Sequence, residues 1–130
     1  MIGRWGTRII FTVSDKRILT FQDFKRKVAG EWAEHGRLGQ KDQAEFLKPQ
    51  LQEVTFSIEL NAMYGVRPRS TMDALVRAVE QGEVHVLVIG TRRVGNYYWR
   101  ITDISEAWDV VMNRGELVKA TLDITMKEYL

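Results

Sequence analysis

The sequence predicts an α+β domain in which mostly antiparallel strands form a β-sandwich or barrel and one helix packs on it. Two segments alternate apolar and polar residues almost without error, glycine-containing loops separate several apolar segments, and one segment has its apolar residues at helical spacing. The chain has 130 residues, of which 45% are hydrophobic. This length suits one domain with one core, so we expect a single domain over residues 1–130.

The clearest strands are expected at residues 54–62 and 118–127. In both segments the even-numbered residues are apolar and the odd-numbered residues are polar. This alternation predicts one buried face and one solvent-facing face for each strand. Further strands are expected at residues 9–13 and, less regularly, at 24–34.

A curved strand is expected from Trp99 to about Met112. Its apolar residues change from odd to even positions, and a bulge near Thr102 or Asp103 would produce that change. Residues 113–115, which end in glycine, predict a hairpin to the C-terminal strand. Residues 90–96 similarly predict a hairpin between the apolar segment 84–89 and the aromatic segment 97–99.

One helix is expected between residues 68 and 81. The apolar residues with helical spacing are Met72, Leu75, Val76 and Val79. Ser70 or Thr71 is expected to cap its first turn, and Gly82 is expected to end its last turn.

Residues 36–52 are predicted to form a long loop or an extended hairpin arm. The segment is polar, and Phe46 and Leu47 are its only consecutive large apolar residues. They offer little area to offset a backbone ordering cost of roughly 1–2 kcal/mol per residue. We therefore expect Phe46 and Leu47 to anchor the arm on a neighbouring chain, with Pro49 stiffening its return.

Trp5 is the other candidate for a subunit contact. It lies between Gly3 and Gly6, ahead of the first expected strand. A large apolar residue in such a segment either docks on a neighbouring surface or packs in the core, and the sequence leaves both alternatives open.

We expect no catalytic, cofactor or metal site. The chain has no cysteine, and His35 and His85 are far apart in the sequence, without metal-ligand spacing. No serine lies in a Gly-x-Ser-x-Gly motif. Residues 90–95 have the glycine spacing of a phosphate loop, but the required lysine and hydroxyl residue do not follow, and a strand is expected where a helix is needed.

The charge pattern does not favour a nucleic-acid-binding protein. Lysine and arginine number 19, against 17 aspartate and glutamate residues. The one run of three basic residues, at 25–27, falls in an expected strand, which would divide it between two faces. We expect no sequence-specific nucleic-acid binding. We also expect no membrane insertion, because no apolar segment approaches the about 20 residues that a spanning helix needs.

Several motifs, in order and spacing along the whole chain, resemble those of the phage tail protein U (GpU-like) family. They include Ile-Gly-x-Trp-Gly at 2–6, Trp-Ala-Glu-His at 32–35, Glu-Phe-Leu-Lys-Pro-x-Leu at 45–51, Tyr-Gly-Val-x-Pro-Arg at 64–69 and Lys-Glu-Tyr at 127–129. One departure is Lys48, where glycine is expected before Pro49.

The resemblance implies a structural protein of contractile phage tails or tail-derived bacteriocins, with a fold similar to that of phage tail-tube proteins. It further implies a hexameric ring continuous with the tail tube near the baseplate. Expected partners are copies of itself and neighbouring tail-tube, baseplate-hub or tape-measure proteins, in a particle whose subunits are made in the bacterial cytoplasm. A tail-terminator or head-to-tail connector ring is the alternative, and a small nucleic-acid-binding module is a third.

Overall fold

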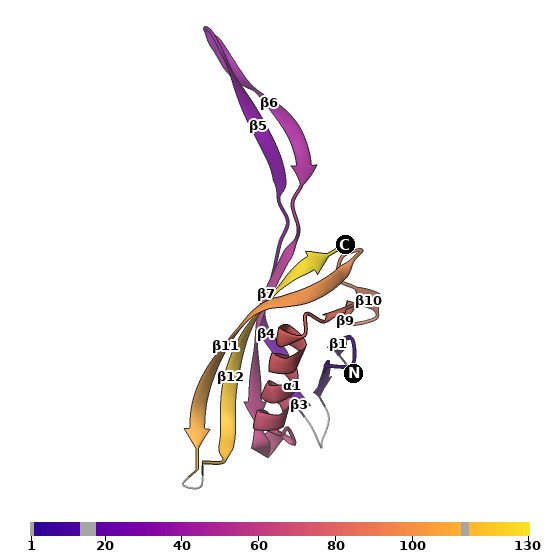
Figure 1. The fold of residues 1–130 in the computed structure, drawn as a ribbon, viewed down its shortest axis with the longest axis vertical. Helices are drawn as coiled ribbons and strands as arrows, with labels where there is room; N and C mark the ends of the chain where they lie inside the picture. The colour runs from indigo at the N-terminus through magenta and orange to yellow at the C-terminus, as the bar shows by residue number, and fades with distance from the viewer. Residues whose placement is uncertain (1, 14–17, 113–114) are drawn as a thin grey trace.

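The computed structural model describes residues 2–13, 18–112 and 115–130. They form two five-stranded antiparallel sheets, a separate two-stranded hairpin and the α-helix α1 (Pro68–Glu80) (Figure 1). A single 3-10 turn, Ala62–Tyr64, precedes the helix. The prediction of a mostly antiparallel α+β fold is therefore confirmed.

The strands of the two sheets come from both halves of the chain. The smaller sheet has the order β10-β9-β1-β2-β3, with bounds Arg92–Arg93, Leu87–Ile89, Gly3–Trp5, Ile9–Val13 and Ile18–Leu19. The larger sheet has the order β4-β7-β12-β11-β8, with bounds Phe21–Lys27, Glu53–Asn61, Leu117–Tyr129, Tyr98–Val111 and Val84–His85. The hairpin consists of β5 (Gly30–Arg37) and β6 (Gln40–Pro49).

Strands β7 and β12 form the centre of the larger sheet. They pair without interruption from Lys119 opposite Asn61 to Lys127 opposite Glu53. The even-numbered side chains are buried from residue 54 to 60 and from 120 to 128, whereas the odd-numbered ones in these stretches keep contact with solvent. The alternation predicted from the sequence is confirmed there, because one face of this sheet is covered and the other is not. It is wrong at the start of β12, where Leu117 is buried and Val118 is only half-buried.

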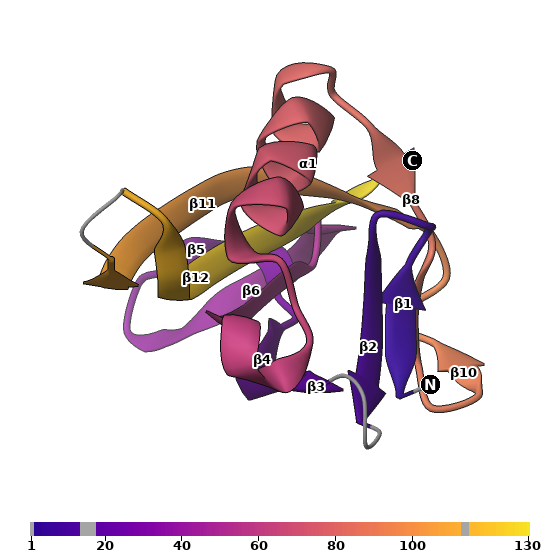
Figure 2. The same ribbon diagram turned by 90° about the horizontal axis from the view of Figure 1, so that it is seen from below.

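Helix α1 covers the buried face of the larger sheet, where it contacts β7, β11 and β12 (Figure 2). Met72, Leu75 and Ala78, spaced three residues apart, are its buried apolar side chains within the helix body. The predicted capping by Ser70 or Thr71 is wrong. The helix begins at Pro68, whose missing N–H is not needed at this position, and Arg67 occupies the cap without a side-chain hydrogen bond.

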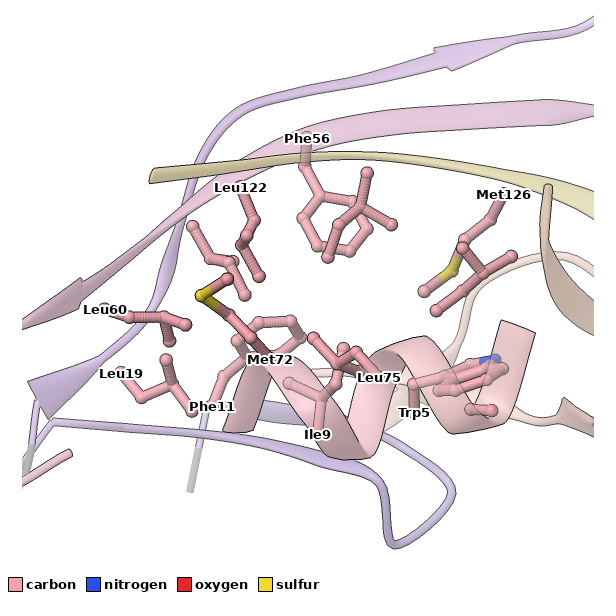
Figure 3. Close-up of a cluster of buried hydrophobic side chains, with 14 of the residues drawn as sticks. Trp5, Ile9, Phe11, Leu19, Phe56, Leu60, Met72, Leu75, Leu122 and Met126 are labelled. Carbon is pink, nitrogen blue, oxygen red and sulfur yellow. The ribbon is translucent and has the colours of Figure 1, made fainter. Parts of the chain in front are cut away.

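The core lies between the larger sheet, α1 and the smaller sheet. In Figure 3, Phe56, Leu122 and Met126 point from the larger sheet toward Met72 and Leu75 of the helix. Ile9 and Phe11 of β2 close the opposite side. Phe11 and Phe56 meet nearly edge to face, with ring centroids 5.9 Å apart, so the two sheets are packed directly on each other.

The expected strand over residues 24–34 is wrong as a single element. Strand β4 ends at Lys27 and pairs with β7, whereas β5 begins at Gly30 and pairs with β6. Val28 and Trp32, which the single strand would have included, are both exposed. The chain leaves the body after Lys27, so no sheet is present there to cover them.

Strand β11 behaves as predicted. Its register with β12 shifts between Ile101 and Asp103, which confirms the bulge at this point. The hairpin between β11 and β12 is also confirmed, and Gly115 has a φ of 78°. Asn113 and Arg114 of the predicted turn lie outside the described residues.

The second predicted hairpin is more complex than expected. The apolar segment 84–89 divides at Val86 into β8, which pairs with Trp99 and Arg100, and β9, which pairs with β1 and β10. The chain therefore passes from the larger sheet to the smaller sheet within this segment. The sequence does not show the division because no glycine or proline interrupts residues 84–89.

Replacing Phe56 with aspartate is expected to prevent folding. The side chain is buried among Phe11, Phe21 and Phe24, and an unpaired carboxylate there costs several kcal/mol. Soluble expression and thermal melting followed by circular dichroism provide the measurement.

The matched control is Glu59→Ala in the same strand. Its carboxylate lies on the open face, 3.6 Å from Lys119 Nζ, and such exposed pairs contribute about 0–1 kcal/mol. This variant should fold and melt cooperatively. A cooperatively melting Phe56→Asp protein would contradict the assigned face.

Candidate functional site

The hairpin β5–β6 forms an arm that projects far from the body (Figure 1). Within the described chain its two strands pair only with each other. Every residue of β6 is exposed. The extended-hairpin interpretation of this region is therefore confirmed, although the arm begins at Gly30 and includes residues that the sequence assigned to a strand of the body.

The arm presents apolar side chains near its base and middle. Trp32, Phe46 and Leu47 have exposed fractions of 59%, 50% and 51%. Trp32 and Phe46 lie opposite each other, with ring centroids 5.1 Å apart. A Cβ at Gly30 would lie 2.9 Å from the Phe46 ring, so glycine lets this ring approach the backbone. These contacts organise the arm but leave about half of its apolar surface uncovered.

Gln52 fastens the base of the arm to the body. Its backbone N–H donates to Glu128 Oε1 at 2.6 Å, and its carbonyl accepts from the Glu128 N–H at 3.1 Å. Its side-chain oxygen accepts from Arg26 Nε and Nη2 at 2.9 and 2.7 Å. The base is thus tied to both β12 and β4.

Sequence reasoning missed this clamp, although one signal was available. Glu128 continues the even-numbered series that is apolar from Val118 to Met126. It is only 6% exposed, and a charged residue in a buried phase indicates a specific partner. That partner is the backbone of Gln52, which no sequence pattern identifies.

The four predicted contact residues fall in two places. Phe46, Leu47 and Pro49 lie within four residues of one another on β6, and all three are exposed. Their contact with another chain stays a prediction. Lys48, the departure from the family pattern, lies in the same strand, with its Nζ 3.5 Å from Glu31 Oε2.

The expectation that Trp5 docks on a neighbouring subunit is wrong. Trp5 is fully buried, and its indole N–H donates to the Trp99 carbonyl at 3.0 Å. Its ring meets His85 edge to face at 4.7 Å. The flanking Gly6 has a φ of 55° and no room for a Cβ beside His85, so the glycines serve tight core packing instead of an exposed loop.

A second exposed apolar region lies at the far end of β11. Trp108, Val110, Val111 and Met112 are all about half exposed. In the part of the chain that the structure describes, β8 covers this strand only at Trp99 and Arg100, so the outer edge from Ile101 onward is open. Consecutive apolar residues at 110–112 were the sequence signal for this region, since one face of a strand cannot bury all three.

The comparisons with known proteins decide which family this arrangement belongs to. The family model Phage P2 GpU matches residues 8–130. The chain belongs to this family. The resemblance found in the sequence is thereby confirmed, and the protein is a structural component of a phage tail. A search of the curated proteins found no match.

The GpU match includes both the body and the arm. It begins just before β2 and continues through β5, β6 and the β11–β12 hairpin to the last residue. The projecting arm is therefore within the region that defines family membership.

Over residues 2–13, 18–112 and 115–130, no three potential metal ligands lie together. The helix described above is too short and too polar to cross a membrane, and no other described helix qualifies.

The strongest electrostatic interaction lies at the junction of the two sheets. Arg8 Nε donates to Glu83 Oε1 at 2.9 Å and its Nη2 donates to Oε2, while His85 Nε2 lies 2.9 Å from Oε1. The Arg8 hydrogen bonds, and then the one from His85, lower the pKa of Glu83 from its ordinary 4.5 to about 2. This group joins the turn after β1 to the start of β8.

In the Glu83→Gln variant, the free energy of unfolding should fall less steeply than in the wild type as the pH is lowered. Because the folded-state pKa is below the unfolded one, the carboxylate stabilises the fold above about pH 4.5, and this contribution is lost as pH falls toward 2. Urea unfolding at pH 7, 4 and 3 should show a less stable variant at pH 7 whose difference from the wild type shrinks on acidification. A difference that is constant with pH would contradict this assignment.

Hydrogen exchange across residues 30–49 should be fast in a monomeric sample and slow in assembled tails. An isolated two-stranded hairpin is marginally stable in water, and a partner must supply the missing burial. Protection of the arm in a monomeric sample would contradict this view.

Phe46→Ala should impair tail assembly while lowering the free energy of unfolding by no more than about 1 kcal/mol, since the ring is half exposed. Particle yield and urea unfolding measure the two effects. The control is Met63→Ala, an 86% exposed apolar residue on the body, which should affect neither. If Phe46→Ala unfolds the domain and shows no separate loss of assembly, Phe46 contributes to the core of the subunit and this prediction is wrong.

Proposed function

We propose that the chain forms a hexameric ring continuous with the tail tube near the baseplate of a contractile phage tail or a tail-derived bacteriocin. In this proposal it acts through contacts with its neighbours and not through catalysis, and it binds no cofactor. The observation that carries the proposal is the projecting arm, together with membership of the GpU family.

The energetics of the arm support a role in assembly. Trp32, Phe46 and Leu47 each keep about half of their surface exposed in the free chain. A neighbouring subunit that covers these three residues would bury the remaining apolar surface, which is favourable. It could also form hydrogen bonds along the open edges of the hairpin.

The body supports a ring around a channel. Helix α1 covers one face of the larger sheet (Figure 2). The opposite face presents the odd-numbered, polar side chains of β7 and β12. Ser57 Oγ donates to Asp123 Oδ1 across β7 and β12, and Lys119 pairs with Glu59 beside them. A sheet with one apolar and one hydrated face suits a subunit whose helix points outward and whose polar face lines an aqueous lumen.

The proposed partners follow from the two parts of the chain that could contact other subunits, the body and the arm. The body would meet copies of the same chain around the ring. The arm would reach along the tail axis to the next ring, formed by a tail-tube, baseplate-hub or tape-measure protein. A tail-terminator or connector ring would use the same surfaces at the other end of the tube.

The test replaces residues 32–47 with a two-residue Asn-Gly turn in the strain that produces the particle. Because Gln52 holds the base of the arm from outside the deleted segment, the shortened chain should fold, with an unchanged melting transition. It should form rings that fail to join the tail, so intact particles should be lost by at least about tenfold. Normal particle yield with the shortened chain would overturn the role of the arm.

A further inference from the structure

We propose that the exposed turn of the β9–β10 hairpin, which carries Arg92 and Arg93, docks in an acidic groove between α1 and β11 of a neighbouring copy. The inference rests on the proposed ring and names one contact that would hold adjacent subunits together. It involves the smaller sheet and the helix, to which neither the arm nor the polar face of the larger sheet gives a role.

The acidic groove lies where the helix passes the open edge of β11. Val76, Val79 and Glu80 of α1 line it on one side, and Ile104 and Glu106 of β11 line it on the other, around a volume of about 250 Å³. The two strand residues belong to the covered face of β11, because their partners in β12 are buried. The three apolar side chains are half-buried and the two glutamates are exposed. The groove therefore offers an apolar surface with carboxylates beside it.

The apolar side chains of the helix extend beyond the surface that the subunit itself covers. Met72, Leu75 and Ala78 are buried in the core. Val76 and Val79 lie on the adjoining side of the same helix and stay half-exposed. Covering these two valines with a neighbouring chain would bury apolar area, which is favourable.

The two glutamates of the groove lack a cationic partner within the described chain. Neither Glu80 nor Glu106 takes part in any of its ion pairs. Glu106 accepts a hydrogen bond of 3.4 Å from Trp108 Nε1 in its own strand. Arg69 lies over the Trp108 ring, 5.5 Å from the ring centroid, and forms no ion pair with Glu106. Both carboxylates can therefore accept hydrogen bonds from a cation of another chain.

The β9–β10 turn supplies such cations. Gly90 has a φ of 67°, which glycine adopts readily, and it begins a two-residue turn. Arg92 and Arg93 follow the turn and are exposed, with Val94 half-buried next to them. Over the described residues neither arginine forms an ion pair, and Arg93 Nη2 donates at 3.4 Å to the Asn96 carbonyl. The turn thus presents two guanidinium groups beside an apolar side chain, which complements the groove.

The turn and the groove lie on different sides of the body. In Figure 2, β10 lies at the right, while α1 and most of β11 lie at the centre and left. Figure 1 shows β10 and the last turn of α1 at a similar height along the long axis. Copies placed side by side in the same orientation would bring the turn of one toward the groove of the next. Such a contact joins two different surfaces, which generates a ring if the rotation closes.

Exchanging the charges tests this contact in the strain that produces the particle. Arg92→Glu with Arg93→Glu should lower particle yield by at least about tenfold, because like charges would then face each other across the interface. Glu80→Arg with Glu106→Arg should do the same from the other side. A chain with all four substitutions should recover to within about threefold of the wild type, because opposite charges face each other again. Each purified variant should keep the wild-type melting transition, since all four residues are exposed.

The matched control adds Asp73→Arg and Glu116→Arg to the chain with the reversed turn. Both acidic residues are exposed and lie outside the groove. This chain has the same net charge as the exchanged one, but it should stay defective. Normal yield after either reversal, a defect that the exchange does not relieve, or equal recovery with the control would overturn the inference.

A crosslink that adds no spacer tests the same contact without reversing a charge. Arg92→Lys keeps the positive charge and supplies an amine, which a carbodiimide joins to a carboxylate in contact with it. Purified tails should give covalent dimers and larger oligomers joined at Glu80 or Glu106, and Glu80→Gln with Glu106→Gln should remove them. Crosslinks from these glutamates to Lys41 or Lys48 of the arm instead would overturn the inference. A ring without the crosslink at position 92 leaves the proposed function standing, whereas the absence of a ring removes both.

Discussion

The pairing of β7 with β12 is the constraint on which the rest of the fold depends. Their unbroken ladder places one apolar side chain from each strand, at every second position, on the same face. A slip of one residue in either strand would turn the apolar series of that strand to solvent. Helix α1, the smaller sheet and the buried Trp5 all pack on the surface that this register creates.

The same ladder explains why surfaces are left for assembly. Each of the two central strands has a hydrogen-bonded neighbour on both sides. The unpaired strand edges therefore belong to the outer strands β4 and β11. The chain between β4 and β7 leaves the body and returns through Gln52, whose hydrogen bonds to Glu128 fix where the arm emerges. The free edges and the arm therefore lie at defined positions on a rigid sheet, which suits a subunit of an ordered particle.

The sequence predicted those parts of the fold that local periodicity determines. The strands around Phe56 and Leu122, the bulge after Ile101 and the arm near Phe46 follow from residue alternation, a phase change and a polar segment. Trp5 was ambiguous because its burial depends on Trp99 and His85, residues distant in sequence that no local pattern connects to it.

Other features depend on tertiary contacts that a single sequence does not show. The segment 24–34 has continuous strand-forming character, and it is divided by a change of pairing partner, from β7 up to Lys27 to β6 from Gly30 onward. The helix starts at Pro68 because of the backbone at Arg67, although Ser70 and Thr71 are better capping residues in isolation. The open edge of β11 is visible only once the limited length of β8 is known.

The central claim is that the surfaces exposed on this chain are those buried in the tail. A cryo-electron microscopy map of the intact particle, at a resolution that shows side chains, tests it most directly. The account predicts a ring of copies at the baseplate end of the tube, with Trp32, Phe46 and Leu47 covered by a neighbouring chain. A ring whose arms extend into solvent, or a tail that lacks this chain, would contradict it.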